Sequence, residues 1–233
     1  MSEAVRYELH GDVASIFFDD GKANALSHAA IDGLNAALDQ ADAEAKAVVI
    51  AGRPGRFCAG FDLSVMSGGV DAVRALVRAG ADLSVRLYSL ERPVVLACTG
   101  HALAAGAILL MTGDVRIGAA GEFKIGLNEV SIGMPVPHFA SQLARDRLSR
   151  RHLTSATSLA TIFDPEGALD AGFLDAVVSP DAVIATAQER AATLASTLSG
   201  PAFRTTRTNI RGSVVAAIRA ELDADLAGFF VAP

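Results

Sequence analysis

The chain has 233 residues, of which 51% are hydrophobic and 20% are charged, a composition typical of a compact globular protein and not of a disordered one. Its net charge is −6 and its pI is about 5.3, which argues against the broad basic surface of a nucleic-acid-binding protein. Any anionic ligand must therefore be held by local basic groups.

Cysteine usage and the N-terminal residues predict a compartment. Cys58 and Cys98 are the only cysteines; they form no disulfide framework and lack metal-ligand spacing, which favours reduced thiols in a cytoplasmic protein without a bound metal. The first residues contain no apolar core of a signal peptide. We expect a cytoplasmic protein.

Strands and helices are predicted to alternate through most of the chain, which favours an α/β class. Two apolar runs around the Gly11-Asp12 turn predict a hairpin, and Ser27 is placed to cap the first helix. The expected elements, in chain order, are strands at 7–10, 13–18 and 47–51, a helix over 71–90, a strand at 93–98, a helix over 102–112, a strand at 115–118, helices from 138 to about 148 and from Asp164, and a strand at 174–178.

Residues 93–113 carry no charge, and about 20 apolar residues would suffice to cross a bilayer. Pro93, the break at 99–101 and Gly106 divide the segment, so a buried strand followed by a buried helix is expected and no membrane span. Only helical patterns follow residue 180. We expect a core over residues 1–180 and a helical oligomerisation region over 181–233, with Phe229 and Phe230 suited to subunit packing.

Two loops rich in small residues lie where chemistry is expected, at 56–63 and 100–108. Glycine and alanine let backbone approach a ligand closely, and free N–H groups at a helix start can stabilise a developing oxyanion. Two such donors on one carbonyl could stabilise an enolate. Each loop alone is better explained by ordinary tight packing, but both occur upstream of Glu129 in a fixed order.

These segments together resemble the crotonase (enoyl-CoA hydratase/isomerase) superfamily, over about residues 13–178. The resemblance implies an α/β fold built as a crotonase-like spiral of ββα repeats with a C-terminal helical region, assembled as a homotrimer or hexamer. The matching stretches are Lys22 to Leu26, Phe57 to Leu63, Gly100 to Asp114, Gly126 to Pro135 and Ala168 to Asp175.

The resemblance also implies the residues of the site. The N–H groups of Phe61 and Ala105 would form the oxyanion hole for the thioester carbonyl; many relatives have Gly at the second position, where Ala105 narrows the backbone options. Coenzyme A would arrive as part of an acyl-CoA substrate, with no permanently bound cofactor. The expected contacts with that substrate are Lys22, Ala23, Ala25, Arg56, Ala59, Gly60, Asp62, Leu63 and Ile108.

One carboxylate is present where hydratases of this family have two. The resemblance places their two glutamates at Ile108 and Glu129, and only Glu129 is acidic here, as in the Δ3-Δ2-enoyl-CoA isomerase branch. A single carboxylate that reaches C2 and C4 can move a proton between them. Ile108 would keep water away, and an apolar pocket would raise the pKa of Glu129. The sequence therefore favours isomerisation in fatty-acid metabolism.

Other functions of the same fold stay open. They are an enoyl-CoA hydratase (a lyase) that uses another carboxylate or a water chain, a catalytically weak acyl-CoA-binding protein, and thioester hydrolase or dehalogenase chemistry.

Several other polar residues are interpreted as structural. Asp62 and Asp114 are expected to cap or pair, and Cys58 to pack, because no histidine lies beside it in sequence. His101 and His138 are expected to have hydrogen-bonded structural roles, with a place in the pocket lining as the alternative. Three arginines at helical spacing are interpreted as a solvated face, with coenzyme A phosphates as the alternative; they are Arg204, Arg207 and Arg211.

Overall fold

The computed structural model describes residues 4–229, which form a mixed α/β fold around a six-stranded sheet of order β1-β2-β4-β7-β9-β11. The first two strands pair as the expected antiparallel hairpin, and the other neighbours in the sheet are parallel. The strands are β1 (Val5–His10), β2 (Val13–Phe18), β4 (Ala47–Ala51), β7 (Val94–Cys98), β9 (Val115–Ala119) and β11 (Ala176–Val178).

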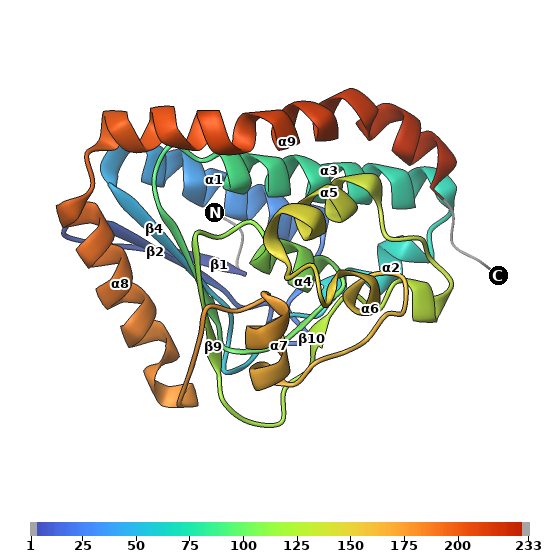
Figure 1. The fold of residues 1–233 in the computed structure, drawn as a ribbon, viewed down its shortest axis with the longest axis horizontal. Coiled ribbons are helices and arrows are strands. Elements are labelled where there is room, and N and C mark those ends of the chain that lie inside the picture. Colours follow the sequence, from blue (N-terminus) through green and yellow to red (C-terminus); the bar gives the residue numbers. More distant parts are fainter. Residues whose placement is uncertain (1–3, 230–233) are drawn as a thin grey trace.

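Helices cover both faces of this sheet, so its central strands β4 and β7 are buried throughout, as expected for parallel strands. One face packs against α1 (His28–Glu44) and α3 (Val70–Ser89). The other packs against α8 (Val183–Thr197). Figure 1 shows α8 beside the sheet and α9 (Gly200–Gly228) lying along α3.

Local sequence rules account for the first helix. The Ser27 side chain accepts a hydrogen bond from the N–H of Ala30 at 3.2 Å, which satisfies one of the free donors at the helix start. Ile31, Leu34 and Leu38 then recur at helical spacing and are all buried in the core. The predicted cap and apolar face of this helix are confirmed.

A smaller parallel sheet has the order β10-β8-β5, and it corrects one prediction. The helix expected over 102–112 is wrong at its start: Gly100–Leu103 is strand β8, and helix α4 covers only Ala105–Leu110. β8 lies between β5 (Gly55–Cys58) and β10 (Ile125–Gly126), and this pairing outweighs the local helical pattern.

Short elements connect these units. Strand β3 (Ala25–Leu26) pairs with β6 (Gly60–Phe61). The remaining helices are α2 (Leu63–Met66), α5 (His138–Arg147), α6 (Leu153–Ala156) and α7 (Pro165–Ala171), with 3-10 turns at Val130–Ile132 and Pro180–Ala182.

No helix within residues 4–229 has the length and apolar composition needed to span a membrane. The uncharged segment 93–113 is instead divided among β7, β8 and α4, as its internal breaks predict.

The solvated face predicted on α9 is wrong for two of its three arginines. Arg207 and Arg211 are buried and both pair with the carboxylate of Asp114, Arg211 at 2.9 Å. Arg211 also lies over the ring of Tyr88 at 4.4 Å. Helical spacing shows that the arginines share a face, but not that this face meets an acid from a distant segment. These two guanidinium groups anchor α9 and are not available for coenzyme A phosphates.

Asp114→Asn should lower the free energy of unfolding by about 3 kcal/mol, because it leaves two buried guanidinium groups without their carboxylate. Urea denaturation measures the change. Glu91→Gln is the matched control, since it removes the exposed partner of Arg204, 3.6 Å away, and exposed pairs contribute less than about 1 kcal/mol. Equal losses in the two variants would contradict the anchoring role.

Candidate active site

Three loops meet at the carboxyl edge of the small sheet. Strands β5, β8 and β10 are parallel, so the segments that follow them, 59–61, 104–105 and 127–129, leave from the same edge, where ligands of open α/β sheets commonly bind. The first two segments touch: a Cβ built on Gly60 would lie 3.2 Å from the Ala104 Cβ and 3.8 Å from the Ala105 nitrogen.

A cavity of about 1120 Å³ opens at this edge. Arg56 is exposed and Ala105 is buried, and neither side chain belongs to the cavity lining. The other residues predicted for the site all line the cavity; they are Lys22, Ala23, Ala25, Ala59, Gly60, Phe61, Asp62, Leu63, Ile108 and Glu129.

The backbone supplies two candidate donors near the cavity. Ala105 is the first residue of α4, and the preceding residue forms no side-chain cap, so its N–H has no intrahelical acceptor. The ring of Phe61 packs closely on Gly80 of α3, which holds Phe61 in place. A Cβ atom added at Gly80 would lie 2.4 Å from the nearest ring carbon of Phe61. The N–H of Asp62 donates to the Leu26 carbonyl at 3.1 Å, so in extended backbone the preceding N–H, that of Phe61, points the other way.

Backbone strain lies at Ala104, the residue before the proposed donor Ala105. Ala104 has φ 49° and ψ −121°, a region that a Cβ makes unfavourable and glycine adopts freely. Ala105 starts the helix and needs no unusual conformation. In this conformation the chain turns sharply from β8 into α4. The N-terminus of α4 therefore lies beside the cavity, which Ala104 lines.

Ala104→Gly should raise the free energy of unfolding by about 1 kcal/mol, because relief of the strained φ exceeds the added freedom of the unfolded chain. A thermal melt should show a higher Tm. Ala107→Gly, inside α4, should lower stability by about 1 kcal/mol or more. A Tm that falls equally in both variants would show that Ala104 is not strained.

Asn24 was not predicted as a site residue, yet it holds two sides of the cavity together. It is fully buried with φ 54°, and its side-chain amide donates to the carbonyls of Phe18, Arg56 and Phe57 at 2.7–3.3 Å. It thereby joins the 20–25 loop to β5, which leads into the Phe61 loop. An Asn within a Gly- and Asp-rich loop is the sequence signal for such a left-handed turn.

Glu129 is buried, with 4% of its surface exposed, so it is not a surface glutamate at a strand end. It lies between β10 and the 3-10 turn that starts at Val130. Its Oε2 atom is buried without a hydrogen-bond partner. Burial raises the pKa of Glu129 to about 7, although its own backbone N–H acts in the opposite direction. A carboxyl with such a pKa can exchange protons near neutral pH.

The other two acids that line the cavity are already engaged. The Asp20 carboxylate accepts hydrogen bonds from the N–H groups of Lys22, Asn24 and Ala25 at 2.7–3.0 Å. Asp62 caps α2 and accepts from the N–H and hydroxyl of Ser64. Among the acids of the described lining, Glu129 alone has a buried carboxylate oxygen without a partner.

Ile108 of α4 supplies an apolar wall and is 2% exposed. The second polar feature beside Glu129 is the amide of Asn128, whose Oδ1 atom is also buried without a partner. This part of the cavity therefore combines one carboxylate with an unpartnered buried oxygen, one neighbouring amide and an apolar wall.

The remaining candidates have structural contacts. Burial raises the pKa of both Cys58 and Cys98 to about 12, so neither thiol is an activated nucleophile. The ring of His101 accepts the N–H of Lys124. His138 begins α5, where its N–H donates to Asp225.

Comparisons with known proteins show the family of this chain. The family model for enoyl-CoA hydratase/isomerase matches residues 8–229. The human mitochondrial enoyl-CoA delta isomerase 1 is 29% identical over 222 residues, which cover 93% of this chain and 73% of the human protein.

Solved structures are similar over almost the whole chain. An enoyl-CoA hydratase/isomerase family protein from Pseudomonas syringae is 40% identical with a TM-score of 0.95, covering 98% of this chain and 99% of that one. An enoyl-CoA isomerase from Mycobacterium tuberculosis is 42% identical with a TM-score of 0.93, covering 98% and 100%. These likenesses confirm the expected crotonase-like fold.

The names of relatives do not separate the two reactions. A second structure of the same Mycobacterium tuberculosis protein, also 42% identical with a TM-score of 0.93 over 97% of this chain and 95% of that one, is named a probable enoyl-CoA hydratase. One and the same relative thus carries both an isomerase name and a hydratase name. The reaction has to be inferred from the residues of the cavity.

Proposed function

Because the chain belongs to the enoyl-CoA hydratase/isomerase family, we propose that it catalyses Δ3-Δ2-enoyl-CoA isomerisation in fatty-acid metabolism, with Glu129 as the only catalytic acid–base group. The observation that supports this choice is the buried, unpartnered Oε2 of Glu129 in a cavity whose other acids are engaged. Hydration would need a second free carboxylate or an equivalent donor, and Ile108 occupies the position where hydratases of the family have one.

In this mechanism the N–H groups of Phe61 and Ala105 bind the thioester carbonyl oxygen. Their hydrogen bonds stabilise the negative charge that develops when a proton leaves C2, and one such donor typically contributes about 3–4 kcal/mol to the transition state. Glu129 takes the C2 proton, the electron pair delocalises into a dienolate, and Glu129 returns the proton at C4. The double bond has then moved from C3–C4 to C2–C3.

The remaining cavity residues bind the substrate. Lys22 is exposed at the cavity, where its ammonium group attracts a coenzyme A phosphate. The 20–25 loop, held by Asp20 and Asn24, presents backbone next to the thioester. Ile108 keeps the dienolate away from water. Coenzyme A enters and leaves as part of the substrate and product.

The activity should depend on pH through Glu129. The base acts in its ionised form, and its pKa is raised by burial to about 7. We therefore expect kcat/KM to fall tenfold per pH unit below about pH 7 and to level off above it. A pH–rate profile measures this. A profile that stays flat down to pH 5 would contradict a base with this raised pKa.

The proposed reaction is tested by two initial rates. Purified protein is given a 3-enoyl-CoA and, separately, the 2-enoyl-CoA of the same chain length. Migration of the double bond in the first without rapid water addition to the second supports the isomerase. Rapid hydration would support a lyase, and tight binding without turnover of either compound would indicate an acyl-CoA-binding protein.

A further inference from the structure

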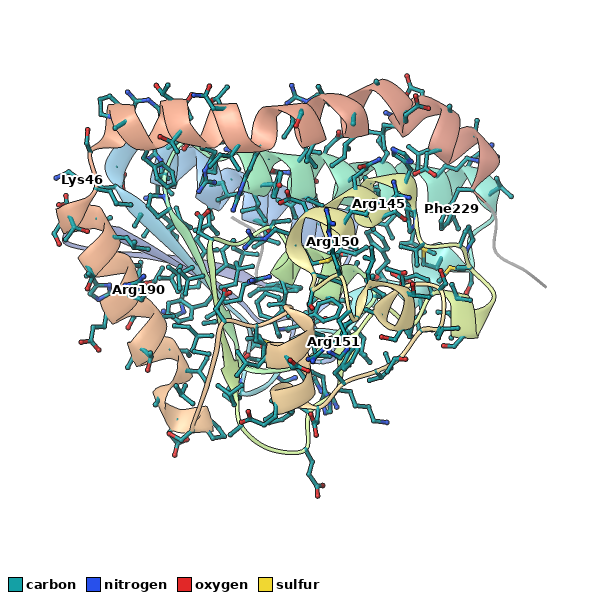
Figure 2. The ribbon with its side chains drawn as sticks, viewed as in Figure 1. Lys46, Arg145, Arg150, Arg151, Arg190 and Phe229 are labelled. Atoms are coloured by element: carbon teal, nitrogen blue, oxygen red, sulfur yellow. The ribbon has the colours of Figure 1, made fainter. Side chains whose placement is uncertain are left out.

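The end of α9 forms part of the cavity wall. Phe229 follows directly after this helix, is 6% exposed and lines the cavity together with residues of α2 and α3. Figure 2 shows Phe229 below the carboxyl end of α9. The interpretation of Phe229 as a subunit contact did not include a role in the chain's own site, and Phe230 lies outside the described residues.

Contacts from two other helices fix this part of α9. On α3, the Arg74 side chain donates to the carbonyl of Ala227, and Arg78 pairs with Asp223. At the start of α5, the N–H of His138 donates to the Asp225 carboxylate at 2.8 Å. The last two turns of α9 are therefore held in place, and so is the residue that follows them.

Helix α3 gives the position of Phe229 within the cavity. Three residues of α3 recur at a spacing of three along one side of the helix. Arg74 contacts Ala227, Val77 lines the cavity, and Gly80 packs against the Phe61 ring. Six residues of α-helix span about 9 Å. The end of α9 thus meets the cavity about two helical turns from the ring of Phe61, whose N–H is the proposed oxyanion donor.

Several apolar side chains line the cavity, beside Ser64 and Ser67 of the α2 region. The apolar residues include Met66, Val77, Met134 and Phe229, whereas Asp20 and Lys22 lie on the loop at which coenzyme A is proposed to bind. An apolar wall favours a hydrocarbon chain over a phosphate or a sugar. An acyl chain that extended from Phe61 along α3 toward Phe229 would therefore meet apolar side chains.

We propose that Phe229 closes the acyl end of the cavity and sets the longest acyl chain that the protein accepts. The proposal rests on the proposed function in one respect, that the ligand is an acyl-CoA. It adds a specificity-determining residue at the end of α9, which lies far from Glu129 in the sequence. A smaller side chain at position 229 opens space at the end of the chain and leaves the reacting atoms untouched.

The test uses equilibrium binding of saturated acyl-CoAs of increasing chain length to the full chain, because saturated chains do not react. For wild type, affinity should increase with chain length up to a limit and then fall. In Phe229→Ala the limit should move to longer chains, with affinity for the first chain beyond the wild-type limit higher by about tenfold or more. Affinity for short chains should change little.

Leu222→Ala is the matched control. Leu222 is also a buried apolar residue of α9, but it belongs to the helix packing and not to the cavity lining. It should lower the Tm and leave the chain-length limit unchanged. The proposal is overturned if Phe229→Ala keeps the wild-type limit, if it weakens all chain lengths equally, or if wild type shows no limit or binds no acyl-CoA.

Binding and turnover separate this inference from the proposed reaction. A limit that moves in Phe229→Ala, in a protein that does not isomerise 3-enoyl-CoA, would contradict the reaction and support the role of Phe229. Isomerisation of 3-enoyl-CoA together with an unchanged chain-length limit in Phe229→Ala would support the reaction and contradict the role of Phe229.

Discussion

Glu129→Gln is expected to lose 3-enoyl-CoA isomerisation by about 10²–10⁴-fold in kcat, the usual contribution of a general acid–base group. The amide keeps the shape of the side chain but cannot take a proton from C2. Binding of a saturated acyl-CoA should change little, because the proposed oxyanion donors are backbone N–H groups. Initial rates and a binding titration on the same preparation measure the two effects.

Glu122→Gln serves as the control, because it removes an exposed carboxylate shortly before β10 and away from the cavity lining. Its activity should equal that of wild type. If Glu129→Gln also retains wild-type kcat, another group is the base and the proposed mechanism is wrong.

Glu129→Gln should also alter the pH dependence of the free energy of unfolding. The folded-state pKa of Glu129, about 7, lies above its ordinary value of 4.5, so the folded protein binds more protons than the unfolded chain between these values. Wild type therefore loses stability as pH rises through this window, by about 3 kcal/mol in total. Glu129→Gln lacks this loss, so its stability relative to wild type should increase from pH 4.5 to pH 7. Urea denaturation at pH 5 and pH 8 measures the difference.

Ile108→Glu is expected to introduce hydration of 2-enoyl-CoA, raising its rate by about 10²-fold over wild type. It places a second carboxyl on α4 at the wall of the same cavity, where a pair of acids can position a water and supply a proton. The two carboxyl groups should raise each other's pKa, so one of them is protonated near neutral pH. The appearance of 3-hydroxyacyl-CoA measures the new activity.

Ile108→Gln is the matched control, because it has the size and polarity of glutamate without an ionisable proton. A thermal melt of both variants shows whether the polar side chain at this buried position preserves the fold. If folded Ile108→Glu hydrates no faster than Ile108→Gln, the missing carboxylate does not explain the choice of reaction.

Elements set by local interactions could be predicted from the sequence. The Gly11-Asp12 turn between two apolar runs predicted the hairpin, and Ser27 with its apolar repeat predicted α1. Segment 100–103 was misassigned because an uncharged run before a glycine-rich turn has no periodicity that separates a strand from a helix. Its two partner strands, β5 and β10, lie far from it in the sequence.

The site shows the same division. The family resemblance implies that Phe61, Ala105 and Glu129 belong to the site, and the structure brings their segments to one edge of the small sheet. The sequence alone could not establish that Glu129 is buried, because its burial depends on the segments that pack around the end of β10. The sequence could not show that Asp114 lies against Arg207 and Arg211, or that the end of α9 reaches the cavity, since these contacts join residues about a hundred or more positions apart.

The most direct test of isomerisation by Glu129 alone follows one sample over time. Wild-type protein is mixed with a 3-enoyl-CoA, and the acyl products are monitored by NMR until the composition no longer changes. Isomerisation with one carboxylate predicts that 2-enoyl-CoA appears and persists, without 3-hydroxyacyl-CoA on the same timescale. Conversion of the 2-enoyl-CoA to 3-hydroxyacyl-CoA at a comparable rate would contradict it.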